Sequence, residues 1–282
     1  MKVQNILTSA VVALSAALAM SSTAKAASFI TNFTPNPANP QEDIFLTSIQ
    51  QGGQTLLPFT NLLLVNDARI NFNTPKTSVP NSGAASTDRG ELATNPLGFA
   101  PNEDPTGAEI AAYLGNYNLN NIVDSEDTPT SRFDIDVFFE APVIADSRGL
   151  DSFFFFERGL NSDIQLQAID INGNLVGSSY KITRGKWTAA GYSMDTTEVP
   201  GAQPVGSWGV SYADLGLGSD VVLSGLKLIS ESSFNGPDFK VFATASFCCG
   251  PIPIPEPTTI IGLGAVAGLT LVRRRQMKTK KI

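Results

Sequence analysis

Histidine is absent from all 282 residues of the chain. Its absence excludes Ser-His and Cys-His nucleophile pairs, a His-ligated zinc ion, and the side chain that most often acts as a general base near neutral pH. Only carboxylates, tyrosines and lysines are left for hydrolytic chemistry. The sequence therefore favours a protein that is not an enzyme.

Cysteine is nearly absent as well. The two cysteines, Cys248 and Cys249, are neighbours, and a bridge between adjacent residues closes a strained ring. An internal disulfide therefore does not join distant strands. The two thiols either pair between molecules in an exported chain or are incidental small residues in a spacer, and both interpretations stay open.

The N-terminus has the pattern of a signal peptide. Lys2 precedes an apolar run over residues 6–20, and Ala24, Lys25 and Ala26 form an A-x-A cleavage site. The run is short for a membrane-spanning helix, which needs about 20 residues. We therefore expect the export machinery to recognise residues 1–26 and signal peptidase to cleave before Ala27. A buried N-terminal helix is the alternative.

The composition changes again at the C-terminus. Residues 251–255 alternate proline with isoleucine, which predicts an extended, exposed spacer. An apolar stretch over residues 258–272 follows, and then the basic cluster of Arg273, Arg274 and Arg275. An apolar stretch before a basic cluster is typical of a stop-transfer segment with its charges on the cytoplasmic side. Fifteen residues are few for a spanning helix, although snorkelling arginines and local thinning accommodate the mismatch.

Between the spacer and the apolar stretch lies the tripeptide Pro255, Glu256 and Pro257. With the apolar segment and the arginine cluster, it resembles the PEP-CTERM sorting signal. The resemblance implies recognition by an exosortase, a membrane-embedded cysteine enzyme that cleaves near the motif and releases or re-attaches the protein at the cell surface. Residues 251–282 are then a sorting region with a transmembrane segment at 258–272. An ordinary C-terminal anchor is the alternative.

Four stretches between the two ends resemble an exosortase-dependent surface-protein family described from cyanobacteria. They are residues 83–92, 119–127, 155–162 and 233–240. The resemblance implies a surface location and dependence on exosortase. It implies no active-site residues, because the family has no established catalytic activity.

The net charge becomes clearer without the terminal segments. The whole chain has 19 basic and 26 acidic residues, a formal charge of −7. Residues 27–250 keep 11 basic and 25 acidic residues, a charge of −14. A surface that acidic repels nucleic acid and anionic lipid, which excludes nucleic acid as a partner. It suits an extracellular domain that recruits divalent cations.

Residues 27–250 are rich in short apolar runs separated by proline, asparagine and glycine, the pattern of β-strands. Period-2 alternation predicts strands at 132–140 and 163–169, and four phenylalanines at 153–156 predict a strand buried on both faces. Asn172-Gly173 predicts a type I′ hairpin between 163–169 and 175–182. Further strands are expected at 221–229 and 239–247.

One short helix is expected over residues 107–114, where Thr106 and Glu109 fit a capping box and Gly115 can close the end. Residues 71–105 are rich in polar and turn-forming residues and are expected to form long surface loops. The predicted fold is all-β: a single jelly-roll-like β-sandwich with one short helix.

A calcium site is expected in a loop over residues 118–127. Calcium prefers six to eight oxygen ligands on a loop that can wrap the ion. The candidate ligands are Asn120, Asp124, Glu126 and Asp127. The pattern does not match the EF-hand, and a solvated acidic loop explains the same residues. Asp238 is either a distant further ligand or part of an Asx turn.

Two further sites compete with a structural role. Trp187, Tyr192 and Trp208 could stack against an extracellular polysaccharide, although such aromatics are also common in cores. Asp134 and Asp136 share one face of a predicted strand, as a carboxylate-based glycosidase requires. A solvated outer face explains the same pair.

The sequence as a whole favours an exported, exosortase-sorted protein of the cell surface or extracellular matrix with a structural or adhesive role. A glycan-binding module is the alternative, ahead of a glycosidase. Calcium is the one cofactor expected.

Overall fold

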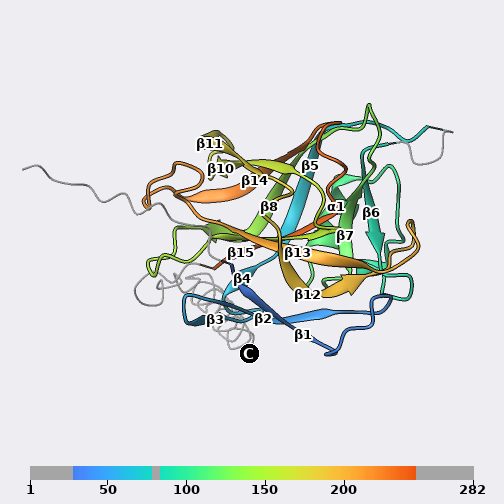
Figure 1. The fold of residues 1–282 in the computed structure, drawn as a ribbon. Helices are drawn as coiled ribbons and strands as arrows, with labels where there is room; N and C mark the ends of the chain where they lie inside the picture. Colours follow the sequence, from blue (N-terminus) through green and yellow to red (C-terminus); the bar gives the residue numbers. More distant parts are fainter. Residues whose placement is uncertain (1–27, 78–82, 246–282) are drawn as a thin grey trace, which may run out of the picture.

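The computed structural model describes residues 28–77 and 83–245 (Figure 1). The expected signal peptide, Cys248 and Cys249, and the whole expected sorting region lie outside the described residues. Within the described ranges, no helix is both long and apolar enough to cross a membrane.

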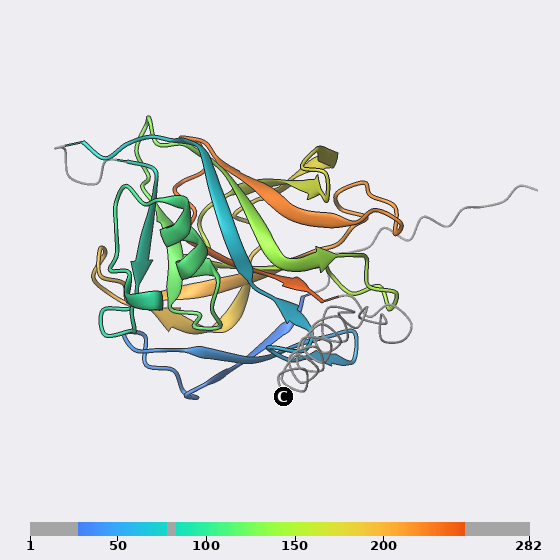
Figure 2. The ribbon, with the colours of Figure 1, turned by 180° about the vertical axis from the view of Figure 1, so that it is seen from behind.

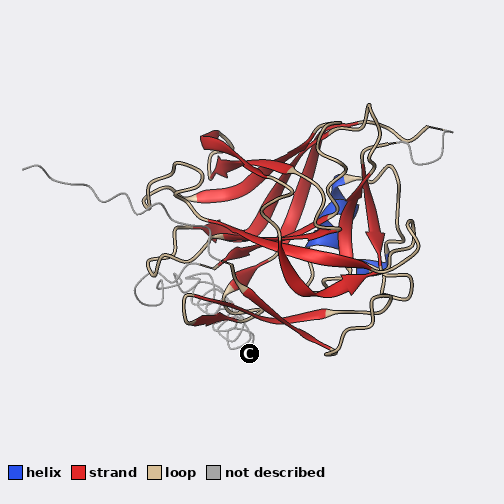
Figure 3. Ribbon diagram, viewed as in Figure 1, coloured by secondary structure: helices blue, strands red, loops and turns tan. Residues whose placement is uncertain are grey.

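The described chain is mostly β-strand, with one α-helix and one short 3-10 turn (Figure 3). The helix α1 is Gly107–Leu114 and the 3-10 turn η1 is Pro96–Gly98. The strands are β1 Ile30–Thr34, β2 Phe45–Gln51, β3 Gln54–Leu56, β4 Leu62–Leu63, β5 Val65–Asn73, β6 Ala85–Arg89, β7 Asn121–Ser125, β8 Phe133–Val143, β9 Phe153–Arg158, β10 Ile164–Asp170, β11 Leu175–Ile182, β12 Thr188–Met194, β13 Gln203–Val210, β14 Leu223–Ser230 and β15 Phe239–Thr244.

Two large antiparallel sheets pack face to face. The five-stranded sheet has the order β11-β10-β14-β8-β5, and the seven-stranded sheet has the order β12-β13-β9-β15-β7-β6 with β4 also paired to β15. Apolar side chains fill the space between them, with Val137 and Leu226 from the first sheet and Phe155 and Val241 from the second. The predicted all-β sandwich is therefore confirmed.

A third, smaller sheet covers the outer face of the seven-stranded sheet. It consists of β1, β2 and β3, drawn in blue in Figure 1. Its Leu46 and Ile49 pack in a second apolar cluster with Phe154, Phe156 and Phe242. Strand β9 is thus buried on both faces, as its run of four phenylalanines predicts. The sequence gives no signal for the extra layer itself.

The short helix is confirmed with the expected bounds and capping box. The hydroxyl of Thr106 accepts a hydrogen bond from the Glu109 amide, and the Glu109 carboxylate accepts one from the Thr106 amide. The helix lies beside β5 (Figure 2). The two backbones approach each other so closely that the first residue of the helix must be glycine. A Cβ on Gly107 would lie 2.1 Å from the carbonyl oxygen of Ala68.

A buried lysine joins the helix to the seven-stranded sheet. Lys240 of β15 has no exposed surface. Its ammonium group donates to the carbonyl oxygens of Tyr113 at 2.8 Å and of Asn121 at 3.2 Å. Hydrogen bonds of this kind offset part of the cost of burying the charge. Packing and hydrogen bonding together stabilise a helix of only two turns, which would not form alone.

Two local predictions are wrong. Residues 71–105 are not all loop, because they contain β6, whose polar residues pair with β7 instead of facing water. The hairpin between β10 and β11 forms, but Gly173 has a positive φ and Asn172 does not. A type I′ turn needs positive φ at both positions. The Asp170 carboxylate instead accepts hydrogen bonds from the amides of Asn172 and Asn174.

Replacing Phe155 by alanine tests the role of β9 in stability. The side chain has no exposed surface, so the loss leaves a cavity between the sheets, and we expect a destabilisation of about 3–5 kcal/mol. The measurement is urea unfolding of residues 27–250. Phe72→Ala is the control, because that ring is 40% exposed, and it should cost less than about 1 kcal/mol. Equal losses in the two variants would contradict the prediction.

Candidate functional site

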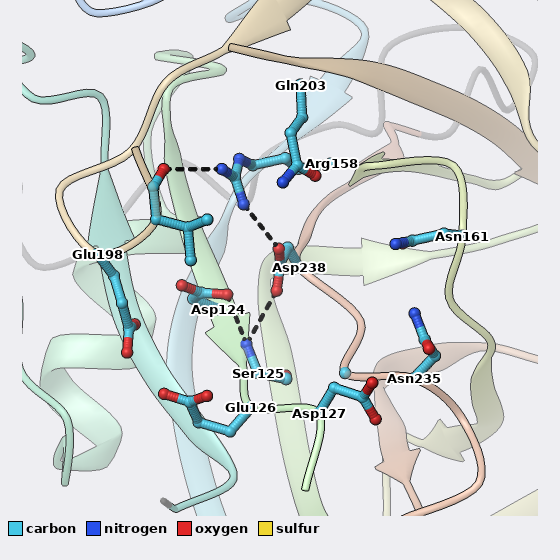
Figure 4. Close-up of a pocket in the computed structure, with 12 residues that line it drawn as sticks. Asp124, Ser125, Glu126, Asp127, Arg158, Asn161, Glu198, Gln203, Asn235 and Asp238 are labelled. Carbon is cyan, nitrogen blue, oxygen red and sulfur yellow. Dashed lines mark hydrogen bonds and ion pairs between the residues drawn. The ribbon is translucent and has the colours of Figure 1, made fainter. Parts of the chain in front are cut away.

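Carboxylates gather in a pocket at one end of the seven-stranded sheet (Figure 4). The pocket has a volume of about 270 Å³. Strand β7 and the residues after it form one wall, the end of β9 forms another, and the loops before β13 and β15 complete it. The side chains that matter for its chemistry are those of Asp124, Glu126, Asp127, Arg158, Glu198 and Asp238.

Strand pairing and one glycine assemble the pocket. Val123 of β7 lies opposite Phe239 of β15, so the preceding Asp238 lies close to Asp124. Gly236 has φ +54°, and a Cβ there would lie 2.1 Å from the carbonyl oxygen of Ser125. Only glycine therefore allows the loop before β15 to approach the end of β7 so closely.

Asp124 and Asp238 are the most buried carboxylates of the pocket. Asp124 is 6% exposed, and its carboxylate accepts a hydrogen bond from the backbone amide of Ser125 at 2.8 Å. Asp238 accepts from the same amide at 3.0 Å and from Arg158 at 3.3 Å. Burial raises the pKa of Asp124 well above its usual value, and the nearby Asp238 raises it further. Burial raises the pKa of Asp238 to about 6.

Two groups of three carboxylates share Glu198. Oxygen atoms of Asp88, Asp124 and Glu198 lie within 4.8 Å of one another, and so do those of Glu103, Glu126 and Glu198. Figure 4 shows the carboxylates of Glu126 and Glu198 reaching into the same space below Asp124. The Oε1 atom of Glu126 is buried and accepts no hydrogen bond from the described residues. A buried acceptor without a partner is uncommon.

Few cations balance the negative charge of the carboxylates in the pocket. Arg158 pairs with Asp238, and Lys76 lies 2.6 Å from Glu103. Burial is the largest cause of the raised pKa values of Glu126, about 8, and of Glu198, about 7, and contacts between carboxyls add to it. A set of oxygen donors without nitrogen or sulfur suits a hard divalent cation such as calcium. The arrangement could hold such an ion.

Three of the four predicted calcium ligands lie at this pocket. Asp124 and Glu126 line it, and Asp127 lies exposed at its mouth. Asn120 does not, because it sits at the other end of β7 with its amide nitrogen donating to the carbonyl oxygens of Pro40 and Glu42. The prediction of a wrapping loop over 118–127 is wrong, since its central half, Asn121–Ser125, is strand β7.

Sequence reasoning missed the carboxylates that come from distant segments. Asp88 lies on β6, Glu103 lies before α1 and Glu198 lies between β12 and β13. Their convergence depends on the order of strands in the seven-stranded sheet. No local spacing encodes that order, so no signal in the sequence could have found them.

The expected glycan platform does not form from its three aromatics. Trp187 is buried, and its ring nitrogen donates to the carbonyl oxygen of Ser162 at 2.8 Å. Tyr192 is buried in the second apolar cluster, and Trp208 is half-buried beside Tyr180. Buried rings have no free face for a sugar, so Trp187 and Tyr192 are core residues.

Asp134 and Asp136 lie on the same face of β8, as expected. Both pair with the ammonium group of Lys227, at 2.5 Å and 3.4 Å, and Asp136 also pairs with Arg69. The two carboxylates are therefore the acidic half of an ion-pair network across three strands. Such a network stabilises the pairing of neighbouring strands.

Comparison of the chain with protein-family models, with curated proteins and with solved structures gave no match. The interpretation of the site therefore rests on its own geometry.

The acidic pocket predicts an unusual pH dependence. Glu126 and Glu198 bind protons more tightly in the folded chain, with pKa values of about 8 and about 7 against a usual 4.5. Without divalent cations, the free energy of unfolding should therefore fall as the pH rises through this window. Urea unfolding midpoints of residues 27–250 across the window measure the slope.

The double variant Glu126→Gln/Glu198→Gln should reduce that slope, because it removes two of the groups that titrate in this window. Glu157, with a pKa raised by burial to about 8, and Asp151, with a pKa raised by burial to about 7, keep part of the slope in the variant. Glu231→Gln is the matched control, since Glu231 is exposed and does not line the pocket. An unchanged slope in the double variant would show that other groups are responsible.

Proposed function

We propose that the chain is exported, is sorted at its C-terminus by an exosortase, and acts as a structural or adhesive protein of the cell surface or extracellular matrix. The terminal sequences support the location. A signal-peptide pattern precedes residue 27, and Pro255, Glu256 and Pro257 precede an apolar segment and an arginine cluster. The described β-sandwich occupies the interval between these two segments.

The proposed architecture of this domain is jelly-roll-like. The chain crosses repeatedly between the two large sheets: β8 belongs to the five-stranded sheet, β9 to the seven-stranded sheet, and β10 with β11 to the five-stranded sheet again. Crossings of this kind are typical of jelly rolls.

The convergence of carboxylates from separate segments in one pocket is the observation that best supports a structural role. Asp88, Glu103, Asp124 and Glu198 come from four different parts of the chain, and Glu126 Oε1 has no hydrogen-bond partner among residues 28–77 and 83–245. A divalent cation bound there would join β6, β7 and the loop before β13. We propose calcium as this ion, because the donors are all oxygens and several are charged.

Calcium should raise the melting temperature of residues 27–250, and EDTA should lower it to that of the metal-free domain. A site saturated at about 100 times its Kd stabilises by about 2.7 kcal/mol, which is a shift of about 5–10 °C for a domain of this size. Thermal unfolding followed by circular dichroism measures the shift.

The calcium effect should disappear in Glu126→Gln/Glu198→Gln and persist in Glu231→Gln. Magnesium is a useful comparison, because it prefers a tighter octahedral site and keeps more of its water. A melting temperature that EDTA leaves unchanged would reject the calcium site, while the proposed sorting would stand.

Replacing Pro255, Glu256 and Pro257 by three alanines tests the proposed sorting. In a host that has an exosortase, the wild-type chain should lose its C-terminal tail, and the variant should keep it and stay in the membrane fraction. Mass spectrometry of the C-terminal peptides distinguishes the two forms. Pro251→Ala/Pro253→Ala is the control and should be processed normally. Release of the triple variant would contradict the proposal.

A further inference from the structure

An apolar groove lies apart from the acidic pocket, between η1, the end of α1 and the turn before β4. Its volume is about 470 Å³. Phe45, Phe59, Leu64, Leu97 and Tyr117 contribute its main apolar surface. Two of these side chains are almost fully exposed, Phe59 at 87% and Leu97 at 88%. Large apolar side chains exposed side by side along a groove mark a binding site more often than isolated ones do.

The backbone holds both exposed side chains in strained conformations. Phe59 has φ +61° and Leu97 has φ +52°, a region that residues other than glycine, asparagine and aspartate rarely adopt. Such strain persists where the surrounding structure fixes it, and it is concentrated at functional sites. Both strained residues line the same groove.

Phe59 is rigidly placed despite its exposure. Its amide donates a hydrogen bond to the hydroxyl of Tyr117 at 2.8 Å, and that hydroxyl donates to the carbonyl oxygen of Leu62 at 2.9 Å. The rings of Phe59 and Tyr117 meet edge to face with centroids 4.5 Å apart. The groove therefore has a preformed aromatic wall.

The groove also contains an unsatisfied acceptor. Asn121 lines it and is 2% exposed. Its side-chain oxygen accepts no hydrogen bond from the described residues, and its amide nitrogen makes one long contact of 3.5 Å to the carbonyl oxygen of Thr94. Buried polar atoms of this kind normally have a partner. An occupant with an N–H donor would supply one.

The last described strand ends beside this groove. Thr244 of β15 pairs with Leu62, and the amide of Ala245 donates to the carbonyl oxygen of Asn61 at 2.8 Å. Asn61 is two residues from Phe59. Five residues separate Ala245 from Pro251 in the sequence, and a chain of that length reaches about 20 Å. The proline-isoleucine stretch 251–255 is therefore tethered within reach of the groove.

The composition of that stretch matches the groove. Alternating proline and isoleucine favour the polyproline II conformation, which docks on aromatic-lined grooves at a small entropic cost. Ile252 and Ile254 carry the N–H groups that could satisfy Asn121. A short tether gives the stretch an effective concentration in the millimolar range, so even weak docking is well populated.

We propose that residues 251–255 dock in this groove of the same chain. The docked stretch covers Phe59 and Leu97 and holds Glu256 against the surface of the domain. The inference does not depend on the proposed sorting, since it concerns the chain before any cleavage.

Site-specific photo-cross-linking of the full-length chain in detergent tests the docking. Phe59 is replaced by p-benzoylphenylalanine, which keeps an aromatic ring at an exposed position. After irradiation and digestion, mass spectrometry should find cross-links from position 59 to residues 251–255. The same replacement at Leu97, on the other exposed side chain of the groove, should give the same partner.

Ile171 provides the matched control position, because it is 59% exposed in the β10–β11 connection and does not line the groove. The cross-linker there should not reach residues 251–255. Ile252→Asp/Ile254→Asp should lower the yield from position 59 by at least about tenfold, since docking would then bury two charges in place of apolar side chains.

Mixing isotope-labelled and unlabelled chains separates docking within one chain from docking between copies. Cross-linked peptides that are wholly labelled or wholly unlabelled support the proposal. Mixed pairs would show a second copy as the occupant. Mixed pairs, cross-links to a saccharide or detergent alone, or the absence of any cross-link to 251–255 would each overturn it.

Discussion

Burial of β9 on both faces is the constraint on which the rest of this structure depends. Its phenylalanines at 153 and 155 face the space between the two large sheets, and those at 154 and 156 face the small sheet of β1, β2 and β3. Aromatic side chains contribute much of the apolar area that stabilises a core. The same strand continues into Arg158, so the apolar packing of β9 also positions the main cation of the acidic pocket.

The acidic pocket keeps its structure only because the apolar core around it is stable. Its carboxylates repel one another and are partly withdrawn from water, which costs free energy. The raised pKa of Glu126 and that of Glu198 record this cost. Apolar packing on β9 and β15 offsets the cost, and a bound cation would remove most of it. Binding of the proposed cation would therefore be coupled to stability at this end of the domain.

Local patterns in the sequence predicted the local structure well. The bounds of α1, its capping box and the strand at 153–156 are correct because neighbouring residues determine them. The third sheet, strand β6 and the contribution of Glu198 to the pocket were not predicted. Each depends on pairing or packing between segments far apart in the chain. Trp187 illustrates the same point, because only its tertiary contacts distinguish a core aromatic from an exposed one.

The pairing of β4 with β15 has a consequence for how the molecule matures. Residues 62–63 find their hydrogen-bonding partners at residues 243–244, close to the end of the described domain. The ribosome synthesises the N-terminal strands first, and they must wait for β15 before the seven-stranded sheet can close. Contacts between residues so far apart in sequence make folding slow. Until synthesis has passed the last strand, the chain stays open and exposes apolar surface on which chaperones act.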